Sequence, residues 1–586
     1  MTAIGTVLES SPNNIQIGIN DSKVFEENKK DLQIGKYVEI SDGNLNKVVS
    51  IIQNIKSTIS NDATGSLKFI LSTQPVGHIE DNKFTRGASL IPSPTEPVYI
   101  IDPSSLDIIF NSNKDFNFPF GKLIQNKIDF KIDANKFFSK HIALVGSTGS
   151  GKSCTVAKIL QDVVGISNKK NAHVAKQKNA HVIIFDIHSE YKAAFDLHGD
   201  EKFTLNNLGV DNLILPYWLL NSDELEALFL EGNDNNHHNQ SSQFKRAVIL
   251  NKELHNPGVK VTYDTPVYFN IDEVFNYIFN LNNEVIGKLP GEHKPKLSDK
   301  TLLHDVDKKE YFSKKLEFVT SSTAAAEKAS NGGFHNEFNR FIPRLETKLG
   351  DKRLSFILRP KKADSGDYKT GDFETILKQF LGYVDKSNVT IIDLSGIPFE
   401  VLSITVSLIS RLVFDFAFHY SKLRHNADEQ NDIPFMIVCE EAHNYIPRTG
   451  GAEYNASKKS IERIAKEGRK YGLSLMVVSQ RPSEVSETIF SQCNNFVSLR
   501  LTNVNDQNYV KGLMPDNSNA IAEILPNLGQ GECLIVGDAV LIPSIVKLEK
   551  PNPEPKSQSV NFQDEWQSDW KDIGFTEVIK RWKKED

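Results

Sequence analysis

The chain has 586 residues, which is long enough for several domains or for one large domain that carries insertions. Hydrophobic residues make up 39% and charged residues 24%, as is ordinary for a soluble globular protein. The formal net charge of -7 excludes a basic field over the whole molecule, so a contact with nucleic acid would have to be local, for example the lining of a channel.

The cysteines and the apolar stretches indicate in which cellular compartment the protein is expected. The four cysteines are scattered without a Cys-x-x-Cys pair, which favours buried thiols in a reducing cytosol over a disulfide or zinc framework. The first residues show no basic stretch followed by an apolar run, so no signal peptide is expected. Residues 401–420 are the best membrane candidate, but Arg411 and Asp415 interrupt them and favour a buried core helix. We therefore predict a cytoplasmic protein without a membrane anchor.

Residues 1–100 consist of short strands separated by turns. Examples are residues 14–19, 36–41, 47–52 and 66–71. Many short strands with polar connections predict a small β-barrel. Because no catalytic constellation occurs in this range, we interpret it as a domain for assembly or partner docking.

The rest of the chain is organised around residues 141–164. A short apolar strand precedes the sequence GSTGSGKS at positions 146–153, and a helical run follows. This context favours a P-loop over a chance glycine-rich turn, because backbone N–H groups and the helix dipole would then bind phosphates. Lys152 would reach the β- and γ-phosphates of ATP, and Ser153 would hold Mg²⁺. The expected ATP-binding residues are Gly146, Ser147, Thr148, Gly149, Ser150, Gly151, Lys152, Ser153 and Cys154.

The next buried strand, residues 181–188, carries polar residues at its carboxyl end. Asp186, His188 and Glu190 lie where open α/β sheets bind ligands, so they are candidates for the neighbourhood of the nucleotide or metal. We assign Asp186 to the metal. A solvated strand end is the alternative interpretation.

Between residues 200 and 350 the alternation of strands and helices lapses, which indicates an inserted helical subdomain. Residues 308–330 are among those expected to be helical, and His237 and His238 fall in a loop that we interpret as solvated. A basic cluster could contact DNA or could be a solvated helix face. It consists of Arg340, Arg344, Lys348, Lys352 and Arg353.

A second apolar strand that ends in acids lies at residues 435–439. This pattern is typical of a Walker B element when it follows a P-loop. We assign Glu440 to the metal ion, through its water shell, and Glu441 to the attacking water as general base.

A basic helix and another buried strand come next. Residues 457–471 are expected to be helical, and Arg463 and Arg469 are candidates for an arginine finger that crosses a subunit boundary. A solvated basic helix is the alternative. Gln480 stands at the tip of the following strand, where its amide can sense the γ-phosphate or hold the water.

The strands together predict the fold class and the domains. The sheet has about seven strands, which indicates an α/β fold with a RecA-like P-loop ATPase core and a helical insertion, preceded by a small N-terminal β-barrel. The core is expected at residues 101–199 and 351–549, the insertion at 200–350, and a linker with a docking tail at 550–586.

The tail follows a proline-rich stretch that predicts a stiff, extended linker. Beyond it, Phe562, Trp566, Trp570 and Ile573 recur at helical spacing. Such an apolar face would dock on a neighbouring subunit or a partner, or on the core of the chain itself.

Taken together, these motifs resemble the HerA family of hexameric DNA translocases, within the wider FtsK–HerA group, over nearly the whole chain. Asp186-Ile-His-Ser-Glu-Tyr191 is similar to the family's Asp-x-His-Gly-Glu-Tyr, with Ser189 where glycine is usual. Glu440-Glu-Ala-His443 is similar to its Asp-Glu-Ala-His, with glutamate on the metal side. Residues 466–472 and 479–483 are close to two further signatures of the family.

The resemblance implies a ring of six subunits, ATP sites at the subunit interfaces and double-stranded DNA in a central channel. It also implies a separate effector chain. Archaeal relatives work with a NurA-like nuclease in end resection, and bacterial relatives are often encoded with a nuclease or a sirtuin-like NADase in anti-phage defence.

Alternative functions differ in how well the motifs fit them. A GTPase is excluded because its guanine-type motif, at residues 126–129, would precede the P-loop. A conjugative coupling or secretion ATPase shares the core but would normally bring a membrane anchor. In a third alternative, ATP binding only assembles a partner enzyme on a scaffold; the intact Lys152, Glu441 and Gln480 argue for turnover instead.

Overall fold

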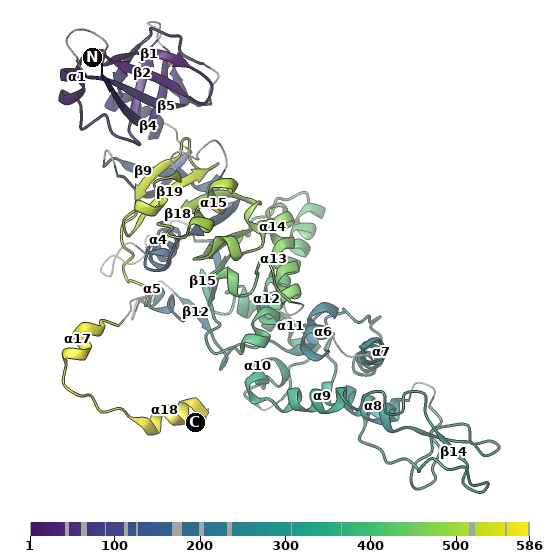
Figure 1. The fold of residues 1–586 in the computed structure, drawn as a ribbon. Coiled ribbons are helices and arrows are strands. Elements are labelled where there is room, and N and C mark those ends of the chain that lie inside the picture. Colours follow the sequence, from purple (N-terminus) through teal and green to yellow (C-terminus); the bar gives the residue numbers. More distant parts are fainter. Residues whose placement is uncertain are drawn as a thin grey trace.

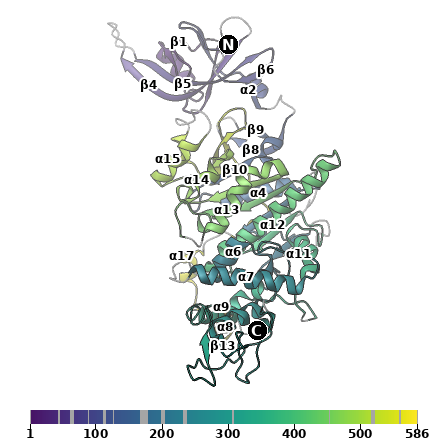
Figure 2. The same ribbon diagram turned by 90° about the vertical axis from the view of Figure 1, so that its right-hand side faces the viewer.

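The computed structural model describes most of the chain. In Figures 1 and 2 a small barrel lies at one end, a large sheet with its helices in the middle, and the loops around β14 at the other end. The residues that the structure leaves undescribed are 1, 42–45, 60–66, 88–89, 111–114, 125–126, 167–177, 198–203, 231–236, 306–307, 365, 452–453, 515–521, 557–559 and 584–586.

The N-terminal domain is a closed antiparallel β-barrel, as the sequence predicts. Six strands follow one another in the order β2-β1-β7-β3-β4-β5, pairing of β2 with β5 closes the ring, and β6 pairs with β5. Residues of alternating strand positions, such as Ile15, Ile17 and Ile19, fill the interior. The strands are β1 (Gly5–Ser10), β2 (Ile15–Ile19), β3 (Tyr37–Ser41), β4 (Lys47–Ile59), β5 (Leu67–Glu80), β6 (Lys83–Arg86) and β7 (Pro97–Ile100), with helix α1 (Ser22–Glu27) after β2.

The middle of the molecule is built on an 11-stranded sheet. Seven neighbouring strands run parallel, which matches the predicted RecA-like core. In spatial order they are β12 (Leu205–Leu208), β15 (Val389–Asp393), β11 (His181–Asp186), β16 (Phe435–Cys439), β17 (Leu473–Ser479), β10 (His141–Val145) and β18 (Cys493–Ser498). Four antiparallel strands continue the sheet: β19 (Glu532–Gly537), β20 (Ser544–Lys547), β8 (Phe116–Leu123) and β9 (Asp129–Asp133).

The strand order explains where the site forms. Strand β10 is buried at every position, as expected of a parallel strand covered on both faces. Strand β17, which ends just before Gln480, lies between β10 and β16, the predicted Walker B strand, and β11 is the next neighbour of β16. Because parallel strands end at the same edge, the P-loop and the tips of β11, β16 and β17 meet at the carboxyl edge of the sheet.

Long helices cover the sheet. Helix α4 (Lys152–Val164) continues from the P-loop, and α12 (Phe399–Asn426) packs against α13 (Asn455–Glu467). Among the described residues, α12 alone is long and apolar enough to cross a membrane, and 78% of its most apolar window is buried inside the protein. This confirms the predicted core helix at residues 401–420. Shorter helices are α2 (Pro103–Phe110), α3 (Ala134–Phe138), α5 (Lys192–Phe195), α14 (Glu487–Phe490) and α15 (Val504–Leu513).

The insertion is helical, but its limits differ from the prediction. Residues 205–208, expected in the insertion, form the edge strand β12 of the large sheet. His237 and His238, expected in a loop, are the first residues of α7. The helices are α6 (Ser222–Phe229), α7 (His237–His255), α8 (Ile271–Asn283), α9 (Phe341–Gly350), α10 (Ser355–Leu358) and α11 (Phe373–Phe380).

The predicted helix at residues 308–330 is wrong. The structure forms only a 3₁₀ turn, Lys309–Phe312, before an irregular stretch that ends in strand β14 (Ala329–Asn331), paired with β13 (Val285–Gly287). Tertiary hydrogen bonds replace the helical ones. The side chain of Asn280 donates to the carbonyl groups of Tyr311 and Lys314, at 3.0 and 2.8 Å, and its oxygen accepts from an N–H group of the same stretch.

The C-terminal segment divides into a fixed strap and an exposed tail. The strap, residues 551–556, is hydrogen-bonded to Gln161 of α4 and to the carbonyl group of Glu190. Beyond it, α17 (Phe562–Gln567) and α18 (Phe575–Lys583) trail away from the body in Figure 1. The single helical face predicted from Phe562 to Ile573 is wrong, because α17 ends at Gln567. Trp570 is 97% exposed, so packing on the chain's own core is not what the structure shows.

Candidate active site

The P-loop has the backbone that phosphate binding requires. Gly149 and Gly151 have φ angles of +74° and +101°, a region that side-chain-bearing residues rarely adopt. A Cβ atom on Gly146 would lie 2.6 Å from the hydroxyl oxygen of Ser150, so glycine is required there as well. The loop thus turns tightly into α4, whose first residue is Lys152.

The polar groups of the loop also fit a phosphate ligand. The hydroxyl group of Ser150 is buried and has no hydrogen-bond partner within the described part of the chain. Lys152 is 8% exposed at the start of α4, where the helix dipole is positive. A phosphate would supply acceptors for both groups, because buried polar groups otherwise need partners. The described site is therefore suited to the nucleotide that the sequence predicts.

The predicted general base lies beside the P-loop lysine. The Nζ atom of Lys152 is 3.7 Å from Oε1 of Glu441, and both side chains are buried. The other carboxylate oxygen of Glu441 lies 3.3 Å from Nδ1 of His443 and accepts a hydrogen bond of 3.4 Å from the backbone N–H of Gln480. Burial lowers the pKa of His443, which favours its neutral form.

Glu440 lies deeper than Glu441. Its Oε2 atom accepts a 2.8 Å hydrogen bond from the hydroxyl group of Tyr191, which is fully buried. Burial and the neighbouring charge of Glu441 raise the pKa of Glu440 to about 8. The sequence motif contains Tyr191 but predicts no role for it; its place in the turn that follows β11, beside the predicted metal residues, is the signal that points to it.

Asp186 shapes a turn. Its two carboxylate oxygens accept the backbone N–H groups of Glu190 and Tyr191, at 3.2 and 2.9 Å. The described residues include no group of three His, Cys, Asp or Glu side chains arranged to hold a metal. The Ser153 hydroxyl and the remaining oxygen of Glu440 are oxygen donors that suit Mg²⁺, which commonly takes one or two protein ligands and keeps water. Asp186 has both oxygens engaged and fits this role less well.

The sensor residue contacts the P-loop directly. The hydroxyl group of Thr148 donates a 2.7 Å hydrogen bond to the amide oxygen of Gln480. Ser147 is fixed as well, because its hydroxyl group lies 3.1 Å from that of Thr502 beyond β18. The structure thus brings the predicted residues from β10, β16 and β17 together at one edge.

The two candidate finger arginines lie elsewhere. Arg463, on α13, lies 4.2 Å above the ring of Phe414 and 3.5 Å from a carboxylate oxygen of Asp415. Arg469, in the 3₁₀ turn Gly468–Tyr471, donates to the side-chain oxygen of Asn494 at 2.9 Å. Asn494 belongs to the amino end of β18, so Arg469 lies at the edge of the sheet opposite its own P-loop.

The basic cluster of the insertion is partly engaged within the protein. Lys348 donates to the carbonyl group of Leu228 at 2.7 Å, and Arg353 forms an ion pair of 2.7 Å with Asp351. Arg340 and Lys352 are exposed. These contacts favour a structural role for Lys348, whereas DNA contact by the cluster as a whole stays a prediction.

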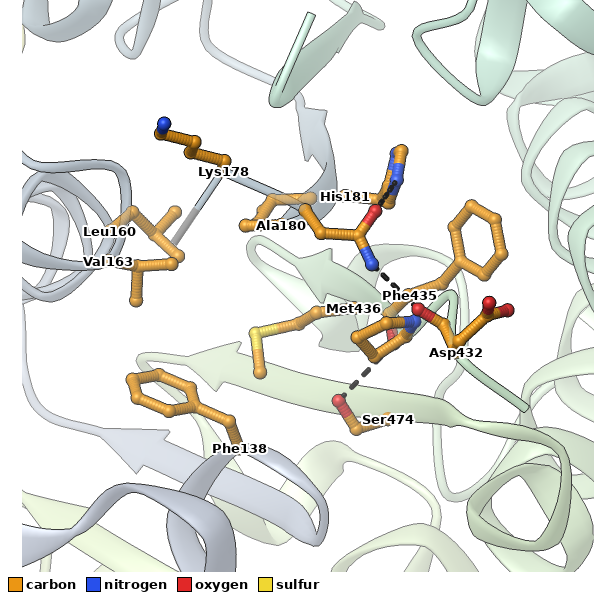
Figure 3. Close-up of a pocket in the computed structure, with 13 residues that line it drawn as sticks. Phe138, Leu160, Val163, Lys178, Ala180, His181, Asp432, Phe435, Met436 and Ser474 are labelled. Atoms are coloured by element: carbon orange, nitrogen blue, oxygen red, sulfur yellow. Dashed lines mark hydrogen bonds between the residues drawn. The ribbon is translucent and has the colours of Figure 1, made fainter. Parts of the chain in front are cut away.

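A pocket of about 550 Å³ lies away from these residues, at the amino ends of the strands. Figure 3 shows Leu160 and Val163 of α4 facing Met436 and Phe435 of β16 across it. Its lining is mostly apolar and includes none of the predicted site residues. The pocket is therefore separate from the predicted active site at the carboxyl edge.

Comparison with known proteins identifies the family. The sequence profile described as "Helicase HerA, central domain" matches residues 118–413, about half of the chain. The chain belongs to the HerA helicase family. The matched range runs from β8 into α12 and contains the P-loop, the Asp186 turn and the whole insertion. As a HerA family member, the chain is an ATP-hydrolysing enzyme of the helicase and translocase class.

Individual relatives resemble the chain over most of its length. The DNA double-strand break repair helicase HerA of Sulfolobus acidocaldarius is 26% identical, over 94% of this chain and 94% of its own. A probable DNA double-strand break repair helicase HerA of Methanocaldococcus jannaschii is 23% identical, over 93% of this chain and 97% of its own. Among solved structures, the bacterial conjugative coupling protein TrwBdeltaN70 is similar over 73% of this chain and 88% of its own, with 13% identity and a TM-score of 0.42.

Proposed function

We propose that the chain is an ATP-driven motor that moves along or unwinds double-stranded DNA as a ring of six subunits. The observation that carries the proposal is the buried pair of Lys152 and Glu441, with 3.7 Å between Nζ and Oε1. It holds a general-base carboxylate beside the ammonium group that would bind the γ-phosphate. One relative is named a DNA double-strand break repair helicase and another a probable one, which supports DNA as the polymer along which the motor moves.

In the proposed reaction, Glu441 accepts a proton from the water that attacks the γ-phosphorus, and the bond to the oxygen of ADP breaks. Lys152 and the N–H groups of the P-loop stabilise the charge on the transferred group. Gln480 is hydrogen-bonded to Thr148 of the P-loop, so it can report on the occupancy of the loop to β17. Ser153 and one oxygen of Glu440 would hold Mg²⁺, which neutralises phosphate charge when bound.

A ring explains the place of Arg469. Arg469 lies at the amino edge, and the P-loop follows the other end of strand β10, whose five residues span about 16 Å. An arginine at that distance cannot reach the γ-phosphate of its own subunit. It can serve as a finger only for a site in a second copy, which supports ATP sites at subunit interfaces.

The partners follow from the family resemblance. We propose that the N-terminal barrel docks a separate effector, a NurA-like or other nuclease or a sirtuin-like NADase, for DNA end processing or anti-phage defence in the cytoplasm. DNA would pass through the central channel. Tracking of the phosphate backbone predicts binding that is sensitive to salt and nearly independent of base sequence.

The test is steady-state ATP hydrolysis by the purified chain, with and without linear duplex DNA, beside Glu441→Gln. We expect hydrolysis that rises with DNA and falls about 10²–10⁴-fold in the variant, because the general base is lost. The variant should still bind ATP, since the P-loop is intact.

Two results would contradict the proposal that the chain is an ATP-driven motor on DNA. Hydrolysis that ignores DNA would favour the alternative, a scaffold whose ATP binding assembles and activates the partner enzyme. ATP binding without any hydrolysis in the wild-type chain would favour the scaffold more strongly, and translocation on DNA would then be abandoned.

A further inference from the structure

The Walker B turn contains a strained residue. Glu441 has φ and ψ angles of 44° and 47°, in the left-handed region. Residues with a side chain rarely adopt this region, because the Cβ atom then crowds the following carbonyl oxygen. Such a conformation persists only where the surrounding structure enforces it. The carboxylate of Glu441 is the group beside Lys152, so whatever enforces this conformation also aims the proposed base.

Two buried tyrosines hold the residue immediately before it. The hydroxyl group of Tyr191 donates to the side-chain Oε2 atom of Glu440 at 2.8 Å, and that of Tyr445 donates to the backbone carbonyl oxygen of Glu440 at 3.0 Å. Both tyrosine side chains are fully buried. One hydroxyl therefore fixes the side chain of Glu440 and the other fixes its peptide group, directly before the strained position.

Each tyrosine is itself rigidly placed. Asp186 accepts the backbone N–H groups of Glu190 and Tyr191, and this fixes the turn that presents the Tyr191 ring. The ring of Tyr445 packs edge-on against Phe185 of β11, with 6.3 Å between the ring centroids. Both anchors thus come from β11, the strand next to β16 in the sheet.

We infer that Tyr191 and Tyr445 are positioning residues that hold Glu440 and thereby force Glu441 into its left-handed conformation, with its carboxylate toward Lys152. The inference rests on the proposed role of Glu441 as general base. It gives the Asp186 turn a function, because that turn carries one of the two hydroxyl groups. Neither tyrosine needs to touch the nucleotide.

The experiment replaces each hydroxyl group singly, as Tyr191→Phe and Tyr445→Phe, and measures kcat, the KM for ATP and the affinity for a non-hydrolysable ATP analogue. We expect kcat to fall about tenfold or more in each variant, since a base displaced by a fraction of an ångström loses this much. Analogue affinity should stay within about twofold, because the P-loop is untouched. A merely structural role would lower affinity and kcat together.

A matched control exists in the insertion. The buried hydroxyl group of Tyr311 donates to the buried carboxylate of Glu284 at 2.7 Å, far from the site in sequence. Tyr311→Phe removes the same kind of hydrogen bond and should leave kcat unchanged. Should Tyr191→Phe not fold, Tyr445→Phe carries the test, because it removes a bond to a different atom of Glu440.

The outcomes separate this inference from the proposed function. If wild-type protein hydrolyses ATP, Glu441→Gln does not, and both tyrosine variants keep kcat within about twofold, the inference is overturned and the function stands. Parallel loss of analogue affinity and kcat would also overturn it. If Glu441→Gln hydrolyses ATP like the wild type, the proposed base itself fails.

Discussion

At the carboxyl edge of the parallel sheet Lys152 and Glu441 are buried together, whereas at the amino edge the fully buried His141 is surrounded by backbone groups. The carboxyl edge holds like and unlike charges in close contact, and it includes a strained backbone. His141 has both ring nitrogens satisfied: Nδ1 accepts the N–H of Leu475 at 3.0 Å, and Nε2 lies 2.9 Å from the carbonyl oxygen of Ala465.

This difference in charge and hydrogen bonding indicates a catalytic role for the groups at the carboxyl edge and a structural role for His141 at the amino edge. Charged groups in contact at the carboxyl edge are costly to bury, and such sites are where catalytic residues concentrate. The neutral imidazole of His141 joins β10 to β17 and to the end of α13. Arg469 follows α13 directly, so His141 connects the P-loop strand to the proposed finger.

The largest expected effect is on kcat, because Arg469 at the amino edge of one subunit is proposed to act on the site at the carboxyl edge of its neighbour. Arg469→Ala should lower kcat about 10³-fold or more if it is the finger, as measured by DNA-stimulated hydrolysis. Arg463→Ala is the control, because Arg463 is held by Phe414 and Asp415, and it should retain most activity.

Mixed rings test whether that finger acts across subunits. Neither Arg469→Ala nor Glu441→Gln alone should hydrolyse ATP at a useful rate. Rings mixed from the two variants should regain part of the rate, because some interfaces then combine an intact finger with an intact base. Mixed rings as inactive as their parents would exclude a finger in trans.

Next in size is a stability effect at the amino edge. His141→Ala should lower the free energy of unfolding by about 4 kcal/mol, because it opens a cavity and leaves two backbone groups unpaired. Chemical denaturation measures it. His255→Ala is the comparison: His255 lies 2.8 Å from Glu273 and is 27% exposed, so a loss of about 1 kcal/mol is expected. Equal losses would contradict the structural role assigned to the buried imidazole of His141.

His141 should also make the free energy of unfolding depend on pH. Burial lowers the pKa of His141 from 6.5 to about 4, so between these values the unfolded chain binds more protons than the folded chain. Stability should therefore fall as pH drops from 6.5 to 4, by about 3 kcal/mol from this residue. The difference between wild-type and His141→Gln denaturation curves isolates the contribution; identical pH slopes would contradict it.

The smallest expected effect is the loss of stability on replacing Gln161, which lies on α4 between the two edges of the sheet. Gln161 of α4 donates to the carbonyl oxygens of Ala194 and Pro553 and accepts the N–H of Asn552. Gln161→Ala should cost about 1–2 kcal/mol and speed hydrogen exchange in the strap, residues 551–556. kcat should stay close to that of the wild type. A large loss of kcat would instead make the strap part of the catalytic machinery.

The local parts of the site were predictable from the sequence. The P-loop, Glu441 and Gln480 each stand at the end of an apolar strand, and a strand with its flanking residues spans only about ten positions. Parallel strands must end at one edge, so the prediction that these residues meet needed only the strand assignment. The prediction of a helix at residues 308–330 was wrong because tertiary hydrogen bonds from Asn280 outweighed the local helical preference.

The sequence by itself determined the family, the nucleotide loop and the acidic strand end, because those signals are local in the chain. Only the tertiary structure decided which distant groups meet: Thr148 with Gln480, 332 positions apart, and Tyr191 with Glu440, 249 positions apart. It also decided that Asp186 serves a turn and that Glu441 is strained. Side-chain contacts of this range depend on strand order and packing, which no local pattern encodes.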